Sequence, residues 1–162
     1  MQGRLKESLK LLLCLAICQL AGLVGGLFTS RTVADWYPTL VKSSLNPPGW
    51  VFAPVWISLF LLMGLALYLV WRSERSPHRL MAAVWFFAQL SFNIMWSGAF
   101  FGLKSPRLGL EVILILWGLI LITMLKFYKI SVAAAWLMLP YLLWVSFAVY
   151  LNWEIFRLNP LN

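Results

Sequence analysis

Charged residues divide the chain into five long apolar stretches. Four stretches contain no charge: 20 residues between Lys10 and Arg31, 29 between Lys42 and Arg72, 24 between Arg79 and Lys104, and 24 between Lys129 and Glu154. The remaining one holds 18 residues between Arg107 and Lys126 and is interrupted only by Glu111. A helix needs about 20 mainly apolar residues to cross a bilayer, and in lipid the backbone must satisfy its own hydrogen bonds. The pattern therefore predicts an all-α integral membrane protein, a bundle of five transmembrane helices.

The same pattern places the helices over about 8–28, 49–71, 79–101, 107–128 and 131–156, within one membrane domain over 1–162. Transmembrane β-strands would be about half as long and would alternate in polarity, which these stretches do not. Pro54 and Pro140 fall inside predicted helices, so each predicts a local bend. The first stretch follows basic residues as a signal peptide does, but its apolar run is too long for one, and we interpret it as a retained helix.

The longest connection covers about 29–48 and is too polar to lie in the bilayer core. It carries Arg31, Asp35 and Lys42 together with Trp36, Tyr37 and the pair Pro47-Pro48. Aromatic residues and prolines in a surface segment favour a semi-rigid cap over one end of the bundle. The alternative, that the aromatics only anchor helix ends at the membrane interface, stays open.

A net charge of +8 would suit a nucleic-acid-binding protein, but its distribution does not. The 13 Lys and Arg lie almost entirely between the spans, where they anchor helix ends at lipid headgroups, so no nucleic-acid partner is expected. With five spans, eight of them fall on the side of the N-terminus and five on the other. The positive-inside rule then predicts a cytoplasmic N-terminus, and a bacterial cell membrane is the expected location.

Ten tryptophans are far more than an ordinary chain of 162 residues contains. Trp36, Trp71 and Trp153 suit the membrane interfaces, whereas four others fall in mid-span: Trp56, Trp96, Trp117 and Trp144. Gln89 and Asn93 are four residues apart, so they share a helix face that Trp96 extends. Two interpretations remain open: polar ties and packing between helices, or a pocket for a large flat apolar ligand.

Other chemistry is poorly represented. Cys14 and Cys18 lack acid or His partners and suit packed thiols, and the single histidine, His78, lies in a basic turn. We find no hydrolytic triad, zinc cluster, phosphate loop or dinucleotide fingerprint. The spacing Gly98-x-x-x-Gly102 suits close helix contact, either inside the chain or between two copies in a homodimer.

Several motifs run in order along nearly the whole chain: Trp36-Tyr37, Asn46-Pro47-Pro48-Gly49-Trp50-Val51-Phe52, Pro54-Val55-Trp56, Phe92-Asn93, Trp96, Phe100-Phe101-Gly102, Trp136, Pro140-Tyr141-Leu142-Leu143-Trp144 and Leu151-Asn152-Trp153. Together these motifs resemble the TspO/MBR family of tryptophan-rich sensory proteins. The resemblance implies a five-helix bundle, often a homodimer, that binds porphyrins and in many members cholesterol or benzodiazepine-type ligands.

The resemblance also implies a pocket beneath the first connection. Carried over by position, its residues are Trp36, Asn46, Pro47, Pro48, Trp56, Gln89, Asn93, Trp96, Trp136, Leu143, Trp144, Phe147 and Ala148. Two departures from the family pattern matter. Lys42-Ser43-Ser44-Leu45 replaces a proline and an aromatic residue, which predicts a less rigid cap, and Trp153 replaces the tyrosine of a proposed sterol motif, which makes cholesterol a poor candidate.

These observations favour a membrane receptor or sensor for protoporphyrin IX or a haem-type tetrapyrrole, which it could also move or sequester. It needs no cofactor, because the tetrapyrrole is the ligand. Light-dependent porphyrin degradation is the alternative enzyme function, although no acid, base or metal site supports ordinary catalysis. A transporter or scaffold is the third alternative; ion coupling is not expected, since no charge lies at mid-bilayer.

Overall fold

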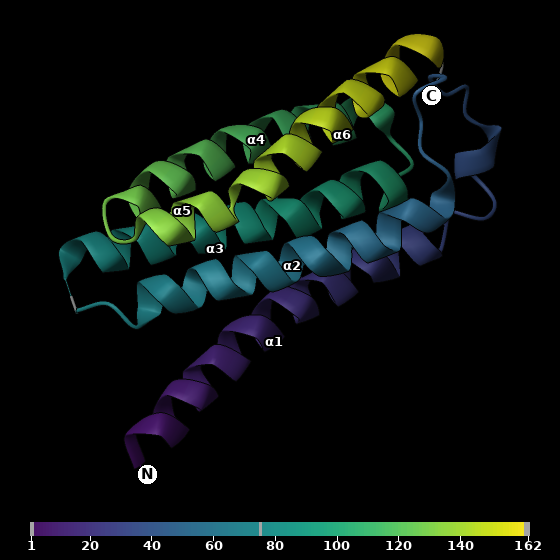
Figure 1. Cartoon of the computed structure of the whole chain (residues 1–162). Helices are drawn as coiled ribbons and strands as arrows, with labels where there is room; N and C mark the ends of the chain where they lie inside the picture. Colours follow the sequence, from purple (N-terminus) through teal and green to yellow (C-terminus); the bar gives the residue numbers. More distant parts are fainter. Residues whose placement is uncertain (1, 75, 161–162) are drawn as a thin grey trace.

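The computed structural model describes residues 2–74 and 76–160, and over these residues it contains helices and connections but no strand. Five helical segments are long and apolar enough to cross a membrane, which confirms the predicted five-helix membrane architecture (Figure 1). The elements are α1 (Gln2–Ser30), η1 (Tyr37–Thr39), α2 (Gly49–Trp71), α3 (Pro77–Ser97), η2 (Gly98–Gly102), α4 (Pro106–Tyr128), α5 (Val132–Leu137) and α6 (Leu139–Leu158).

Sequential spans run antiparallel, so the bundle has two distinct ends. The N-terminus, the α2–α3 turn and the α4–α5 turn lie at one end, called here the N-terminal end (Figure 1). The connection 31–48, the turn into α4 and the C-terminal part of α6 lie at the other, called here the cap end. Helix α4 packs against both α3 and α6, while α1 packs against α2 and α3.

Serines set the starts of three helices. The side chains of Ser76, Ser105 and Ser131 accept hydrogen bonds from backbone amides in the first turns of α3, α4 and α5. Pro77 and Pro106 follow two of them at positions where a missing N–H costs nothing, because the first amides of a helix lack intrahelical partners. These caps allow short turns and start α3 and α4 one or two residues before the predicted positions 79 and 107.

The structure differs from five uninterrupted helices in two places. The fifth span is divided at Met138 into α5 and α6, and Pro140 lies in the first turn of α6. Proline cannot donate to the carbonyl four residues earlier, so the break falls where the sequence predicted a kink. The third span ends in a π-helical turn, η2, which the apolar sequence gave no reason to expect.

Glycines on α1 and α2 allow close helix contact. A Cβ added at Gly64 would lie 2.9 Å from the backbone of Leu15, and one at Gly22 would lie 2.6 Å from the ring of Phe60. Gly102 faces the Phe28 ring of α1 within the same chain, whereas a Cβ at Gly98 would meet no atom within 4 Å. Only Gly102 of the Gly98/Gly102 pair therefore contributes a close contact here, and the homodimer stays a prediction.

Candidate ligand-binding site

A column of aromatic rings runs through the bundle toward its cap end. It comprises Tyr141, Trp56, Trp96, Phe100 and Trp36, and these five residues are called the aromatic column below. The Trp56 ring centroid lies 6.2 Å from those of both Tyr141 and Trp96. Trp96 stacks on Phe100 at 5.9 Å, and Phe100 meets Trp36 edge to face at 5.6 Å. The column thus joins α2, α3, η2 and α6 to the connection that closes the cap end.

Polar side chains from α3 and α6 support the column. The Asn93 side-chain amide donates to the Tyr141 hydroxyl at 2.9 Å. The Trp96 indole N–H donates to Asn152 at 3.1 Å, and the Asn152 amide donates to the Pro106 carbonyl at 2.8 Å. Since indole and amide groups in an apolar interior need partners, these bonds fix the ring orientations.

Gln89 is the exception to this pairing. Its side chain is 0% exposed, and neither its amide oxygen nor its amide nitrogen has a hydrogen-bond partner among the described residues. It lies one turn before Asn93 on the same face of α3, as the sequence predicted. A buried amide without partners costs about 1–3 kcal/mol, so this position favours any molecule that can bond to it.

The π-helical turn η2 positions the rings at the cap end of α3. The Leu103 amide donates to the Gly98 carbonyl, five residues earlier, at 2.8 Å. The Phe101 carbonyl, which lies in the last turn of the span, accepts a bond from the Thr32 hydroxyl at 3.1 Å, and this bond ties η2 to the segment after α1. Phe100 and Phe101 are both buried there, with ring centroids 4.8 Å apart.

The connection 29–48, called here the cap loop, is held by its own polar groups. The Lys42 ammonium donates to the carbonyls of Tyr37 at 2.7 Å and Leu40 at 2.9 Å, and it lies 4.8 Å from the Tyr37 ring centroid. The Tyr37 hydroxyl donates to Asn46 at 2.8 Å. Lys42 therefore holds the cap loop through hydrogen bonds, in the segment where the family pattern has a proline and an aromatic residue.

A second set of bonds fastens the cap loop to α6. The Asn159 side chain accepts from the Val41 amide at 3.0 Å and donates to the Val41 carbonyl at 2.9 Å. The hydroxyls of Ser43 and Tyr150 lie 3.3 Å apart. Asn159 was not predicted, and a short polar residue at a helix end gave no signal that distinguishes it from an ordinary cap.

Burial shifts the pKa values of two residues in the cap loop, Tyr37 and Lys42, in opposite directions. Burial raises the pKa of the Tyr37 hydroxyl, while its bond to Asn46 opposes this effect. Partial burial lowers the pKa of the Lys42 ammonium. Each shift disfavours the charged form, so Tyr37 stays a neutral hydrogen-bond donor at physiological pH.

The predicted pocket residues fall into four groups. Trp36, Trp56 and Trp96 belong to the aromatic column, with Gln89 and Asn93 beside it, while Asn46, Pro47 and Pro48 lead from the cap loop into α2. Trp144 lies between Phe52 at 6.0 Å and Phe147 at 5.9 Å, and Ala148 packs against the core. Trp136 and Leu143 are 62% and 61% exposed and lie outside the column. The ligand-binding role of all the predicted pocket residues stays a prediction.

Sequence reasoning did not select Tyr141 and Asn152 for the site, although both are fully enclosed in the bundle. The signal for Asn152 was available: it is an uncharged polar residue inside a 24-residue stretch without charge. The same signal had identified Gln89 and Asn93.

Comparison with known proteins identifies the family of this chain. A profile of the TspO/MBR family matches residues 14–158. The chain belongs to the TspO/MBR family. It is 46% identical over 156 residues to the "Tryptophan-rich protein TspO" of Chlorobaculum tepidum, covering 96% of this chain and 99% of that one. It is 33% identical over 142 residues to the "Translocator protein" of Sus scrofa, covering 84% of each chain.

A third relative extends the family across kingdoms: the "Tryptophan-rich protein TspO" of Archaeoglobus fulgidus is 38% identical over 151 residues, covering 93% of this chain and 97% of that one. TspO/MBR membership and the five apolar helices together establish an integral, multi-pass membrane protein.

Proposed function

We propose that this chain is a membrane receptor that binds porphyrins and related flat hydrophobic ligands among the rings of the aromatic column. The observation that carries the proposal is the buried Gln89 amide beside Asn93, with both of its polar atoms unpartnered among the described residues. Flat apolar ligands suit stacked indoles, and a small number of polar groups fixes their orientation.

The chemistry of a porphyrin favours one orientation in this site. Its macrocycle is flat and apolar, whereas its carboxylates are charged at physiological pH. Burying a carboxylate among neutral donors is costly, so the carboxylates should face the cap end and water while the ring enters between Trp56 and Trp96. The Gln89 and Asn93 amides would then face the macrocycle, whose remaining polar atoms are the pyrrole nitrogens at its centre.

Entry of such a ligand requires two movements. Trp56 and Trp96 lie with ring centroids 6.2 Å apart at an interplanar angle of 32°, so their rings must separate to admit a macrocycle. The cap loop, which Asn159 and Lys42 hold closed, must also open. Ligand binding should therefore be slow relative to diffusion and limited by opening.

The test is a dark titration of the purified protein in nanodiscs with protoporphyrin IX, followed by the shift of the porphyrin absorbance band. Absorbance is preferable to tryptophan fluorescence because the variants themselves remove tryptophans. We expect saturable binding that Trp56→Leu and Trp144→Leu weaken at least tenfold, equivalent to about 1.4 kcal/mol each.

The matched control is Trp117→Phe, because the Trp117 indole bonds to Ser146 at 2.8 Å on another face of the bundle. Unsaturable uptake that no variant changes would mean that the dye only partitions into lipid, and it would overturn the proposal. Trp136→Leu, measured in the same series, decides whether that exposed indole belongs to the site.

Light-dependent porphyrin degradation would use the same contact between the porphyrin and the tryptophans of the aromatic column, because a tryptophan beside an excited porphyrin can donate an electron to it. The distinguishing measurement illuminates protoporphyrin IX in excess over the protein with dioxygen present. A defined product formed in excess of the protein would assign an enzyme activity, whereas bleaching at the rate of the free dye would leave a receptor. The word "translocator" in the name of the Sus scrofa relative applies to that protein and is compatible with a receptor.

A further inference from the structure

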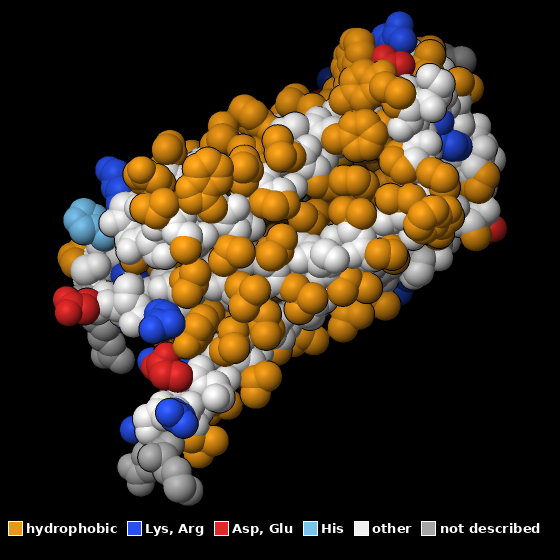
Figure 2. Space-filling model, in the orientation of Figure 1, with side chains coloured by type: hydrophobic (Ala, Val, Ile, Leu, Met, Phe, Trp, Pro, Cys, Tyr) orange, Lys and Arg blue, Asp and Glu red, His pale blue; other side chains and the backbone are white. Residues whose placement is uncertain are grey.

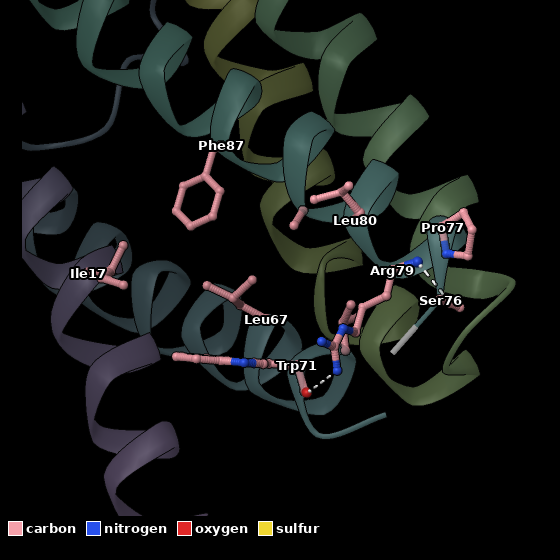
Figure 3. A pocket seen from close by; sticks show the side chains of 10 residues that line it. Ile17, Leu67, Trp71, Ser76, Pro77, Arg79, Leu80 and Phe87 are labelled. Atoms are coloured by element: carbon pink, nitrogen blue, oxygen red, sulfur yellow. Dashed lines mark hydrogen bonds between the residues drawn. The ribbon is translucent and has the colours of Figure 1, made fainter. Parts of the chain in front are cut away.

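A hollow of about 700 Å³ lies between α1, α2 and α3 at the N-terminal end of the bundle, far from the cap loop. Ile17 borders it from α1, Leu67 and Trp71 from α2, and Arg79, Leu80 and Phe87 from α3 (Figure 3). The volume falls within the range of about 300–1,000 Å³ that is usual for ligand pockets. Except for Ser76 and Arg79 at one end, its lining is apolar.

The hollow arises from the course of α1. Near the cap end α1 contacts α3, where a Cβ added at Gly25 would lie 3.1 Å from Ser97. Toward the N-terminal end α1 lies on α2 instead, with Leu15 against Gly64 and the Tyr68 hydroxyl donating to Glu7 at 3.2 Å. The first and third helices therefore diverge toward the N-terminal end (Figure 1), and the hollow lies where they separate.

The opening faces the lipid. Leu80 and Phe87 line the hollow and are nevertheless exposed, so an occupant can enter sideways from the bilayer. From Arg79 to Phe87 the α3 wall runs about 12 Å at a rise of 1.5 Å per residue. That wall is apolar over its length, as the hydrocarbon chain of a lipid requires.

Arg79 supplies a positioned cationic group at the end of the hollow. One guanidinium nitrogen, Nη1, donates to the carbonyls of Trp71 at 3.1 Å and Ser73 at 2.7 Å, which holds the side chain over the C-terminus of α2. Its Nε and Nη2 groups have no partner among the described residues, so they can donate to an oxyanion. Arg72 adds a second positive charge close by, 5.7 Å from the Tyr68 ring.

The charge of this end favours an anionic occupant. The N-terminus and the turns at this end contain eight Lys and Arg and two Glu. The cap end contains five Lys and Arg and three acidic residues. Figure 2 shows basic side chains gathered around the N-terminal end, with an apolar surface between them and the cap end. Such a basic surface attracts anionic lipid.

We propose that this hollow binds one anionic phospholipid from the surrounding leaflet, with an acyl chain along α3 between α1 and α2 and its phosphate on the Arg79 guanidinium. This site is distinct from the aromatic column, and it stands whether or not a porphyrin binds there. A neutral lipid would fill the same space but would lack the attraction to the basic end.

The test compares phosphatidylglycerol with phosphatidylcholine of identical acyl chains, bound to the purified full chain and measured by native mass spectrometry. We expect tighter binding of phosphatidylglycerol to the wild type. Arg79→Gln should reduce that preference about fivefold, which corresponds to the loss of one basic residue near a lipid surface. Arg79→Lys should retain part of the preference for phosphatidylglycerol, because lysine keeps the positive charge but lacks the paired N–H donors of the guanidinium group.

Ala83→Phe provides a second variant that keeps every charge and places a ring in the hollow, so it should weaken both lipids. It also keeps the test decisive if Arg79→Gln fails to fold, since Arg79 bonds the end of α2. Arg107→Gln at the cap end is the matched control and should leave binding unchanged. Equal binding of the two lipids to the wild type, or undiminished phosphatidylglycerol binding in Ala83→Phe, would overturn the proposal.

Discussion

At the residue scale, the Asn93–Tyr141 bond is the clearest polar tie inside the bundle. Both side chains are buried, and the amide donates to the hydroxyl at 2.9 Å. Tyr141→Phe removes the acceptor and leaves a buried amide donor unpaired, so we expect a loss of about 1 kcal/mol in the free energy of unfolding. Unfolding by sodium dodecyl sulfate in mixed micelles measures this difference.

The double variant Asn93→Leu/Tyr141→Phe separates the bond from simple loss of packing. With both polar groups removed, part of the lost stability should return, because no buried donor is left unpaired. A single Tyr141→Phe variant that unfolds as the wild type does would contradict a role of this bond in stability.

Gly109 on α4 is the position where one methyl group should matter most for the aromatic column. An added Cβ would lie 2.7 Å from the Phe100 ring and 2.9 Å from the Asn152 amide oxygen, the acceptor of the Trp96 bond. Gly109→Ala should therefore destabilise the fold by about 1–3 kcal/mol through overpacking.

Gly118→Ala is the matched control for this change, since it lies on the same helix with no atom within 4 Å of the added Cβ. It should be neutral or stabilise the fold by up to about 1 kcal/mol. Thermal unfolding of both variants in one detergent makes the comparison, and equal melting temperatures would refute the packing argument.

The sequence predicted buried polar residues correctly where they interrupt an apolar stretch. Gln89 and Asn93 stood out because amides are rare inside apolar stretches, and the structure places both in the core. Tyr141 did not stand out, because an aromatic residue in a tryptophan-rich span looks like packing. Its importance depends on Asn93, which is 48 residues away in sequence, and no local pattern contains that information.

At the element scale, the closed position of the cap loop depends on one side chain, that of Asn159 at the C-terminal cap of α6. Asn159 holds the amide and the carbonyl of Val41, and it also donates to the Ile155 carbonyl at 2.8 Å. Asn159→Ala should raise the rate of amide hydrogen exchange over residues 40–46 roughly thirtyfold, because its two bonds to Val41 are worth about 1 kcal/mol each.

Hydrogen–deuterium exchange read by mass spectrometry checks this, with Ser44→Ala as the control because its side chain lies exposed in the same loop. Exchange in the transmembrane segments should not change in either variant. If the loop exchanges equally fast in Asn159→Ala and wild type, the Asn159–Val41 contact does not hold the cap loop closed.

Among the elements, the spans were predictable and their irregularities were not. Charges mark the span ends because ionised groups avoid hydrocarbon, and Pro140 predicted the disturbance of the fifth span. The π-helical turn at Gly98–Gly102 follows instead from packing, with Phe100 against Trp36 and the Phe101 carbonyl against Thr32. The cap loop itself was predicted from its aromatics and prolines, but its ties run through Lys42 and Asn159, whose partners are backbone groups.

At the scale of the whole molecule, the two ends of the bundle differ in chemistry. The cap end holds the cap loop over the aromatic column, and the N-terminal end holds the basic turns and the hollow beneath Arg79. The sequence predicted this separation of charge, since five spans place alternate turns on opposite sides. It did not predict the hollow, because the divergence of α1 from α3 depends on which glycines meet which helices.

The charge difference between the ends predicts how the protein lies in its membrane. Eight basic residues at the N-terminal end against five at the cap end favour a cytoplasmic N-terminus. In a bacterial host, alkaline phosphatase fused after Asn162 should then be active, and green fluorescent protein fused there should be dark. The same reporters fused after Lys129, before the fifth span, should give the reverse.

Neutralising four basic residues at the N-terminal end tests whether the charge difference determines the orientation of the protein in the membrane. With Arg72, Arg79, Lys126 and Lys129 changed to Gln, four basic residues would face five, and the reporters should show mixed or inverted orientation. A fluorescent C-terminal fusion of the wild type would mean the opposite orientation. The expected orientation also places the hollow beneath Arg79 in the cytoplasmic leaflet, whose anionic lipids are the proposed occupants. Because Arg79 is one of the four substituted residues, the purified variant should also lose its preference for anionic lipid.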